Sequence, residues 1–405
     1  MEFTELRSQD ARTETYLGGP SIVLLLSGDL LATHTYFGPG SSRSLEHEEH
    51  LTSVYRSSDG GATWTNVNHV GNAFWSSLFV HQGCVHMIGC SQKFGSIVIR
   101  RSEDEGFTWT TPVDARSGLL FQGGYFHQPP NYHCGPVPVL RKNGRLYRAF
   151  ENCSPCAWGR GFRAFVISCA EDDDLLNAVS WTASNELPFE QSWVPDDCGM
   201  PEGAGWLEGN VVETPTGDIW NILRLHSTPY VDKAAVIHVH DEGRRISFDP
   251  ATGIIDFPGG HSKFTIQRDP VTGLYLTLSN SATDPRWPEK RNILSLQASE
   301  DLLHWRRVMN VLEDDSGLSP RKSAKRVGFQ YADWQFDGDD LIYLVQTAYD
   351  GAHDMHDANR ISFHRLRGFR EHLAQERSKA SREHGPPGTH HKAKKAKPAG
   401  RGKRH

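Results

Sequence analysis

Two segments of this 405-residue chain share the motif S-x-D-x-G-x-T-W: SSDGGATW at 57–64 and SEDEGFTW at 102–109. A shortened copy, SEDLLHW, lies at 299–305, and strand-like runs (TSVYRS, SIVIRRS) precede the two complete copies. In such a turn the Asp carboxylate accepts hydrogen bonds from turn amides, Gly supplies a positive φ, and Trp packs against a neighbouring unit. A motif repeated in this way indicates an architecture of similar units that bury their faces against one another.

A second marker, a glycine turn between two strand-like runs, recurs six times along the chain. Each copy is typical of a β-hairpin in which glycine supplies the positive φ. The six glycines are Gly28, Gly83, Gly144, Gly217, Gly273 and Gly338. Six units of four short antiparallel strands predict an all-β fold, a six-bladed β-propeller, with seven blades as the alternative.

Composition divides the chain into three parts. We expect an N-terminal arm at 1–13, the propeller at 14–370, and a short helix followed by a disordered basic tail at 371–405. The last part holds ten Lys and Arg against three Glu, although the net charge of the whole chain is −6. The propeller is therefore acidic, which argues against nucleic acid as its partner, whereas the tail could contact polyanions.

The sequence contains no apolar run long enough for a transmembrane helix, and its first residues are polar. We therefore expect a cytoplasmic protein that does not enter a membrane. The CxxC at Cys153 and Cys156 lacks a second ligand pair at the spacing that zinc requires. We expect neither a metal ion nor another cofactor, and the sequence leaves the oligomeric state open.

The S-x-D-x-G-x-T-W segments resemble the Asp-boxes, also called BNR repeats, of the sialidase (neuraminidase) superfamily. Residues 14–370 are also similar to bacterial sialidase-like proteins labelled exo-α-sialidases, through segments such as AFWSSLFV, WLEGNVVETPTGDI and GFQYADWQFDGDDLIYL. The resemblance implies a propeller, an arginine cluster that binds the substrate carboxylate, a Tyr/Glu nucleophile pair and an Asp acid/base. Gly18 stands where the first of these arginines is expected, so sialidase chemistry does not transfer directly.

Polar residues in the strand before each glycine turn are the candidates for chemistry. The innermost strand of each propeller blade lines the central channel, where ligands bind at one mouth, and a polar group buried there without a partner is costly. In five blades these residues are Asn72 and Trp75, His133, Glu208 and Asn210, His261 and Lys263, and Tyr331 and Asp333. We expect them to form one site that binds a carbohydrate.

Hydrolysis of a glycosidic bond in an anionic glycan, one containing sialic or uronic acid, is the first interpretation. It needs two groups flanking the bond, and Glu208 and Asp333 are the candidate pair. The resemblance adds Tyr331 as nucleophile with Glu208 as its activating base. The candidate substrate-binding residues are Asn72, Trp75, Asn210, Arg224, Lys263 and Arg360.

Two other functions stay open. A uronate polysaccharide lyase needs a base for the α-proton, and His133, His261, Lys263 and Tyr331 suit that β-elimination. A propeller that binds a glycan or a protein without catalysis is favoured by Gly18, which replaces the expected arginine.

Overall fold

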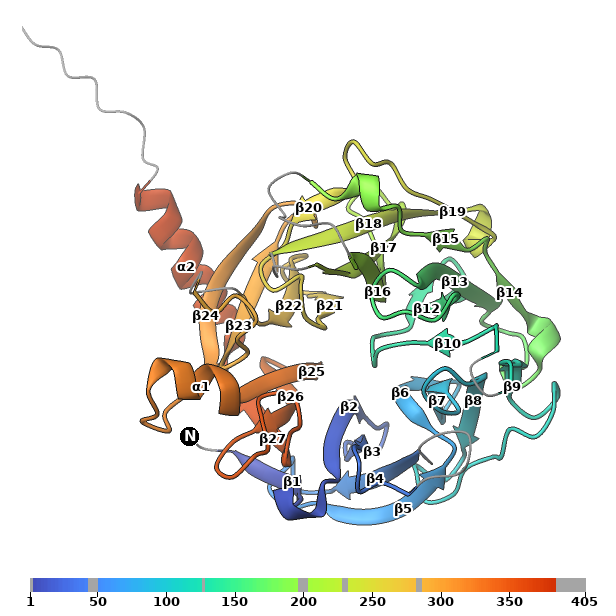
Figure 1. The fold of residues 1–405 in the computed structure, drawn as a ribbon, viewed down its shortest axis with the longest axis horizontal. Coiled ribbons are helices and arrows are strands. Elements are labelled where there is room, and N and C mark those ends of the chain that lie inside the picture. Colours follow the sequence, from blue (N-terminus) through green and yellow to red (C-terminus); the bar gives the residue numbers. More distant parts are fainter. Residues whose placement is uncertain are drawn as a thin grey trace, which may run out of the picture.

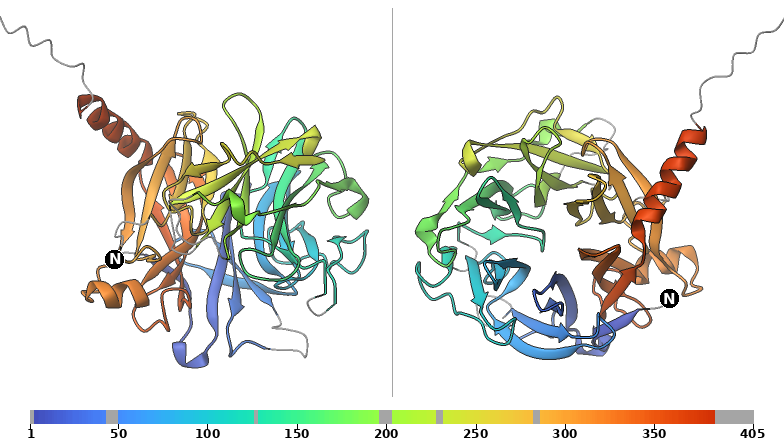
Figure 2. Two further views of the ribbon diagram at one scale, coloured as in Figure 1. Left: turned by 45° about the horizontal axis from the view of Figure 1, so that its top comes forward. Right: turned by 180° about the vertical axis from the view of Figure 1, so that it is seen from behind.

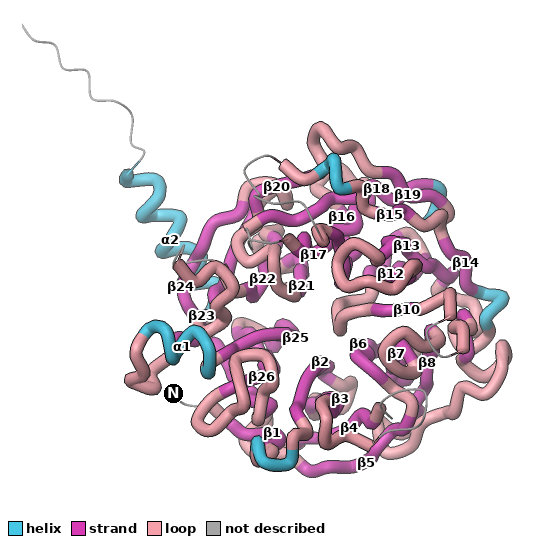
Figure 3. The backbone as a smooth tube through the Cα atoms, in the orientation of Figure 1, coloured by secondary structure: helices cyan, strands magenta, loops and turns pink. Residues whose placement is uncertain are grey.

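Six antiparallel sheets stand around a central axis in the computed structural model (Figure 1). The structure describes residues 3–42, 50–125, 128–195, 203–227, 232–281 and 286–383. Each sheet is one propeller blade, which confirms the predicted six blades over the alternative of seven. Strands cover most of the ring, and helices occur only at its edge (Figure 3).

The strands of the first three blades follow one another along the chain, from residue 16 to residue 188. Blade one is β2 (Tyr16–Leu24), β3 (Leu30–Phe37), β4 (Leu51–Ser57) and β5 (Thr65–Gly71). Blade two is β6 (Phe74–His81), β7 (Cys84–Cys90), β8 (Ile97–Ser102) and β9 (Leu119–Phe121). Blade three is β10 (Tyr132–His133), β11 (Leu140–Lys142), β12 (Arg145–Cys153), β13 (Phe162–Ala170), β14 (Trp181–Ala183) and β15 (Leu187–Pro188).

The remaining blades follow the same order from the axis outward. Blade four is β16 (Gly205–Glu213), β17 (Ile219–His226), β18 (Lys233–His240), β19 (Arg245–Ser247) and β20 (Ile254–Asp256). Blade five is β21 (Thr265–Arg268), β22 (Tyr275–Ser279), β23 (Ile293–Ser299) and β24 (Trp305–Glu313). Blade six is β25 (Gly328–Asp337), β26 (Asp340–Ala348), β27 (Arg360–Leu366) and β1 (Thr4–Ser8).

The N-terminal strand closes the ring. β1 pairs antiparallel with β27, with Thr4 opposite Phe363 and Ser8 opposite Arg360. Within the expected N-terminal arm at 1–13, Thr4–Ser8 therefore supplies the outer strand of the last blade. Because β1 comes from the opposite end of the chain, this pairing joins the last blade to the first.

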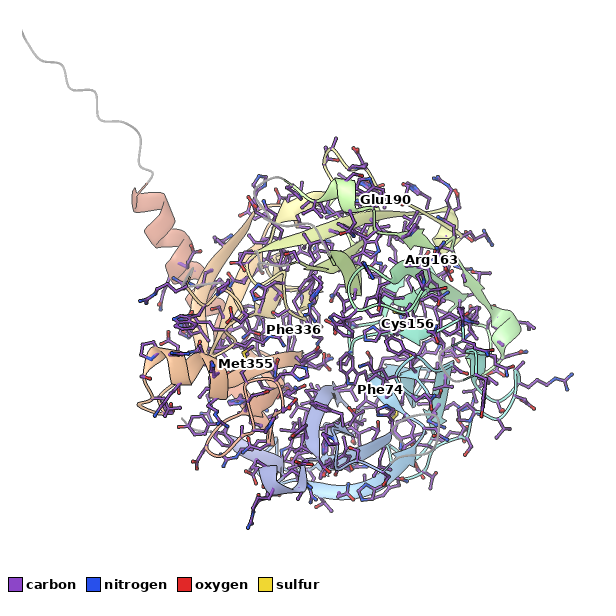
Figure 4. The ribbon with its side chains drawn as sticks, in the orientation of Figure 1. Phe74, Cys156, Arg163, Glu190, Phe336 and Met355 are labelled. Carbon is purple, nitrogen blue, oxygen red and sulfur yellow. The ribbon has the colours of Figure 1, made fainter. Side chains whose placement is uncertain are left out.

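Each contact between neighbouring blades contains a hydrophobic cluster of its own. The cluster between blades one and six, for example, joins Leu17 and Ala32 to Ile342 and Phe363. Five further clusters bridge the other five pairs of neighbouring blades. A blade is thus buried on both faces, which explains why its strands contain continuous apolar runs as well as alternating ones. In Figure 4 side chains fill the space between blades, with Phe74 near the axis and Glu190 at the rim.

The two complete motif copies form the same hydrogen-bonded turn. Asp59 accepts a hydrogen bond from the backbone amide of Thr63 at 2.9 Å, and Asp104 accepts one from the amide of Thr108 at 2.8 Å. Gly61 has φ 96°, and the ring of Trp64 meets that of Phe363 on the preceding blade at 5.4 Å. These segments therefore fold the blades, as their residue types predict.

The described part of the chain has two α-helices, and both lie at the edge of the propeller. Helix α1 spans Pro320–Arg326, and α2 spans Phe369–Glu383, where a terminal helix is predicted. Figure 2 shows α2 beside the outer strands of blade five, where Arg306 of β24 hydrogen-bonds Glu376 at 2.5 Å. The expected disordered tail beyond α2 lies outside the described residues. Within the described part of the chain, no helix has the length and apolar character that a membrane span requires.

Candidate active site

Four innermost strands carry a bulge at the same point. The pairing register shifts between Gly18 and Ser21, Phe74 and Ser77, Leu207 and Asn210, and Gln330 and Asp333. In each bulge one residue has a positive φ: Gly19 (56°), Trp75 (44°), Glu208 (57°) and Tyr331 (53°). Positive φ is unfavourable for every residue except glycine, and bulges redirect side chains near functional sites. Three of these four residues are predicted site residues.

Tyr331, Glu208 and Arg224 form one buried cluster. The Tyr331 hydroxyl donates to Glu208 Oε1 at 3.2 Å, and Arg224 donates to Glu208 Oε2 at 3.0 Å. The side chain of each residue is at most 5% exposed. The carboxylate thus faces a phenol through one oxygen and a cation through the other. In this arrangement Glu208 can take a proton from the Tyr331 phenol through one oxygen while Arg224 stays bonded to the other.

Burial raises the pKa of Tyr331 to about 12, and the charge of Glu208 acts in the same direction. Arg224 and Arg291 oppose this rise because both favour the phenolate. The phenol is therefore protonated at neutral pH and needs a base before it can act as a nucleophile. Glu208 is the carboxylate that contacts it.

Trp75 connects this cluster to blade three. Its ring lies 5.2 Å from the ring of Tyr331 and 5.4 Å from that of His133, measured between centroids. A Cβ atom on Gly19 would come within 2.8 Å of Trp75 Cδ1, so the first blade leaves room for this indole. Trp75 is half-buried, whereas Tyr331 and Glu208 are buried. It is thus the member of the group that solvent reaches.

His133 pairs with a carboxylate that the sequence analysis did not identify. Its Nδ1 lies 3.0 Å from Glu151 Oε2, and Glu151 Oε1 accepts a hydrogen bond from the amide of Gly209 at 3.3 Å. His133 Nε2 has no hydrogen-bond partner among the described residues. β12 places Glu151 directly opposite His133. A search for cross-strand acid–base pairs could have found it.

Asp333 and Asn210 connect neighbouring blades. Asp333 Oδ2 accepts hydrogen bonds from Ser21 Oγ at 2.8 Å and from the amide of Ile22 at 2.9 Å. Asn210 Oδ1 accepts from the amide of Ile266 at 3.1 Å. Both lie two residues after a bulge, as do Ser21 and Ser77, which also bond the next blade. The shared position and partners indicate a latch between blades, and the hydrogen bonds of Asp333 go to blade one.

The two basic residues of blade five also make structural contacts. Lys263 Nζ donates to Thr265 Oγ1 at 2.6 Å and to the Ala332 carbonyl at 2.8 Å. Burial lowers its pKa to about 8, and the nearby Asp333 charge limits the fall. The His261 carbonyl accepts from Arg224 Nε at 2.8 Å, while His261 Nδ1 lies 3.3 Å from Asp232. His261 thus supports Arg224 through its backbone.

The structure places two candidates away from the axis. Arg360 begins β27, two strands out from the axis, where it lies 3.6 Å from Glu5 of β1. Asn72 is exposed and lines a groove between blades one and two. The cluster gains Arg291 instead, which hydrogen-bonds Gln330 and is buried. Arg291 precedes β23 in a loop with no strand pattern, so the sequence carried no signal for it.

One surface group has the donor types of a cation site. His353, Asp354 and Asp357 each offer a ligand atom, and these atoms lie within 4.8 Å of one another. They belong to the loop between β26 and β27, outside the Tyr331 cluster. His353 is exposed and already bonds Asp357 at 2.9 Å, so the group is explained by its own hydrogen bonds.

Comparison with known proteins identifies the fold. No protein-family model matches the sequence, and no curated protein sequence matches it. Among solved structures, an α-L-arabinanase of Penicillium chrysogenum complexed with arabinobiose is similar with a TM-score of 0.55 and 16% identity, covering 91% of this chain and 98% of that one. This chain has the six-bladed sialidase-type propeller fold.

Two further similar structures support the same conclusion. An α-L-arabinofuranosidase of Fusarium graminearum with arabinobiose has a TM-score of 0.56 and 13% identity, over 93% of this chain and 98% of that one. A Trypanosoma rangeli sialidase in complex with sialic acid has a TM-score of 0.54 and 14% identity, over 91% of this chain and 56% of that one. At these identities the likeness establishes the fold and leaves the activity to the site.

Proposed function

We propose that the protein is a glycoside hydrolase that acts on an anionic glycan, with Tyr331 as nucleophile and Glu208 as its base. The observation that carries the proposal is the 3.2 Å hydrogen bond from Tyr331 to Glu208 inside a buried cluster. In this reaction Tyr331 Oη attacks the anomeric carbon as its proton passes to Glu208 Oε1. The bond from that carbon to the aglycone oxygen breaks, and the aglycone takes up a proton from solvent. Water then attacks the same carbon and loses a proton to solvent, while Tyr331 Oη leaves and recovers its proton from Glu208. Two displacements retain the anomeric configuration.

Charge around the axis supports an anionic substrate. Near the axis the buried cations Arg148, Arg224, Lys263 and Arg291 lie among the carboxylates Glu151, Glu208 and Asp333, and Asp232 lies beside His261. Burial in a medium of low dielectric strengthens the attraction between these cations and a substrate carboxylate. The folds of similar arabinose- and sialic-acid-binding enzymes add support for a sugar.

The contacts favour hydrolysis over β-elimination. His133 directs Nδ1 to Glu151 at 3.0 Å, and His261 Nδ1 lies 3.3 Å from Asp232, so each of these two Nδ1 atoms faces a carboxylate. An elimination site would need a base and a second proton-transfer group that converge on one sugar carbon. The Tyr331 and Glu208 pair, in contrast, already places a nucleophile and its base in contact for the attack that we propose.

The test compares wild-type protein with Tyr331→Phe and Glu208→Gln on aryl sialosides, aryl uronides and aryl arabinofuranosides. We expect each variant to lose at least about a hundredfold in kcat with the fold intact, since general base and nucleophile effects have at least that size. Tyr343→Phe is the matched control, because Tyr343 is a buried tyrosine on β26 whose ring stacks on His364 at 5.0 Å.

Three outcomes would contradict the proposal. Unchanged hydrolysis by Tyr331→Phe would exclude the phenol as nucleophile. Folded wild-type protein that hydrolyses no substrate of the panel would favour the binding module, and an unsaturated, ultraviolet-absorbing product from uronic-acid polymers would favour the lyase.

A further inference from the structure

A groove of about 590 Å³ lies between blades one and two, apart from the Tyr331 cluster. It is lined by β5, β8 and the segment between β7 and β8, with side chains that include Asn68, Asn72, Gln92, Arg100 and Trp109. Among the described residues that line it, none is acidic. Its volume lies in the range of small-molecule sites, and its surface combines amide groups with an indole.

Arg100 is the cation of this groove, and it is only 4% exposed. Its NH2 group donates to the carbonyls of Gly71 at 2.8 Å and Asn72 at 2.9 Å, and NH1 lies 3.4 Å from the carbonyl of Thr110. Its Nε has no hydrogen-bond partner among the described residues. These three partners are neutral carbonyls.

The neighbouring arginine, Arg101, has a carboxylate as its partner. It forms an ion pair with Glu103 at 2.9 Å. Burial lowers the pKa of Arg100 to about 10, and no carboxylate in the part of the chain that the structure describes opposes that fall. A guanidinium buried without a counterion is costly, and an anion that also accepts from its free N–H groups would offset that cost.

We propose that this groove binds an acidic saccharide and that Arg100 receives its carboxylate or sulfate group. Asn68, Asn72 and Gln92 offer amide groups for sugar hydroxyls, and Trp109 offers an aromatic face. Asn72, which the sequence suggested as a substrate-binding residue, thus belongs to this second site. The proposal does not depend on catalysis at Tyr331.

The experiment measures binding of glucuronic acid by calorimetry, with glucose and acetate as parallel ligands at matched ionic strength. We expect Arg100→Gln to raise the Kd for glucuronic acid at least about tenfold, because hydrogen bonds to charged groups contribute that much. Thr111→Trp should do the same by filling the groove, since Thr111 is an exposed lining residue. Arg101→Gln is the matched control and should bind like wild type.

Tyr331→Phe separates this site from the proposed active site and should keep full binding at the groove. Binding lost in Tyr331→Phe but kept in Arg100→Gln would place the saccharide at the axis and overturn the proposal. Equal affinity for acetate and glucuronic acid would show that the groove does not recognise the sugar. If wild-type protein binds no glucuronic acid, the proposal is wrong. Thr111→Trp leaves the Arg100 contacts in place, so its result does not depend on the folding of the Arg100 variant.

Discussion

Residues two positions apart on the same strand take different roles because of the bulge between them. Tyr331 lies in the bulge of β25 with φ 53° and bonds Glu208, whereas Asp333 lies after it and bonds Ser21 and Ile22. Burial raises the pKa of Asp333, and the charge of Lys263 opposes that rise. Asp333 is thus buried with a raised pKa, as a catalytic carboxyl can be. Its hydrogen bonds, however, join blade six to blade one.

Substitution of Asp333 distinguishes these two roles. Asp333→Ala should lower the free energy of unfolding by about 2–4 kcal/mol, because the Ser21 hydroxyl and the Ile22 amide lose their acceptor inside the protein. Asp333→Asn keeps an acceptor oxygen, so we expect about 1 kcal/mol of destabilisation and near wild-type hydrolysis. Denaturant unfolding and kcat, measured on the same variants, distinguish the structural role from the catalytic one. Loss of activity in Asp333→Asn at unchanged stability would show that Asp333 is catalytic.

The turn at each motif is the element that positions one blade against the next. In the shortened copy Leu302 takes the glycine's place with φ 70°, and Trp305 Nε1 donates to the Leu302 carbonyl at 2.8 Å. The complete copy at 102–109 makes the equivalent bond from Trp109 Nε1 to Gly106 at 3.0 Å. The backbone conformation is therefore kept even where glycine is absent, because the Asp, Ser and Trp contacts specify it.

Neighbouring glycines in the first turn should differ sharply in their tolerance of alanine. A Cβ atom on Gly61 would lie 2.1 Å from Phe363 Cε1, whereas the nearest atom to a Cβ on Gly60 is Arg365 NH2 at 3.7 Å. We expect Gly61→Ala to cost about 2–4 kcal/mol from overpacking and positive φ, and Gly60→Ala about 1–2 kcal/mol from φ alone. Equal thermal stability of the two variants would show that the contact with Phe363 adjusts without cost.

At the scale of the whole molecule, six inter-blade clusters and the β1–β27 pairing make the ring one cooperative unit. Buried histidines are distributed around it. Burial lowers the pKa of His34, His86 and His226 to about 4 and that of His364 to about 3. Each has a folded pKa below its unfolded value of 6.5, so each binds fewer protons in the folded state.

The protein should therefore lose stability as pH falls below 6.5. The contribution of these histidines is complete above their unfolded pKa and declines toward their folded pKa. For the fully buried His34 the loss is about 2 kcal/mol between about pH 7 and pH 5, at about 1.4 kcal/mol per pKa unit. Denaturant unfolding across this range should show a shallower decline for His34→Gln.

His304→Gln is the control for this prediction. His304 is exposed, and its hydrogen bond with Asp301 raises its pKa, so its contribution has the opposite sign. An identical pH dependence of stability for wild type and His34→Gln would contradict a role for His34 in the loss of stability at low pH.

The sequence by itself determined the six blades, the positions of the inner strands and most residues of the Tyr331 cluster. Its signals were local: a turn motif within eight residues and a glycine between two strand-like runs. Glu208, Tyr331, Trp75 and Arg224 could be found because they interrupt or flank those apolar runs.

Only the tertiary structure decided which polar residues meet. The bulges turn Glu208 and Tyr331 toward each other and leave Asn210 and Asp333 facing the next blade, because one extra residue changes the side to which the following side chains point. Glu151 and Arg291 come from a second strand and a loop, and β1 closes the ring from the far end of the chain. Such contacts depend on register and on chain closure, which no local pattern specifies.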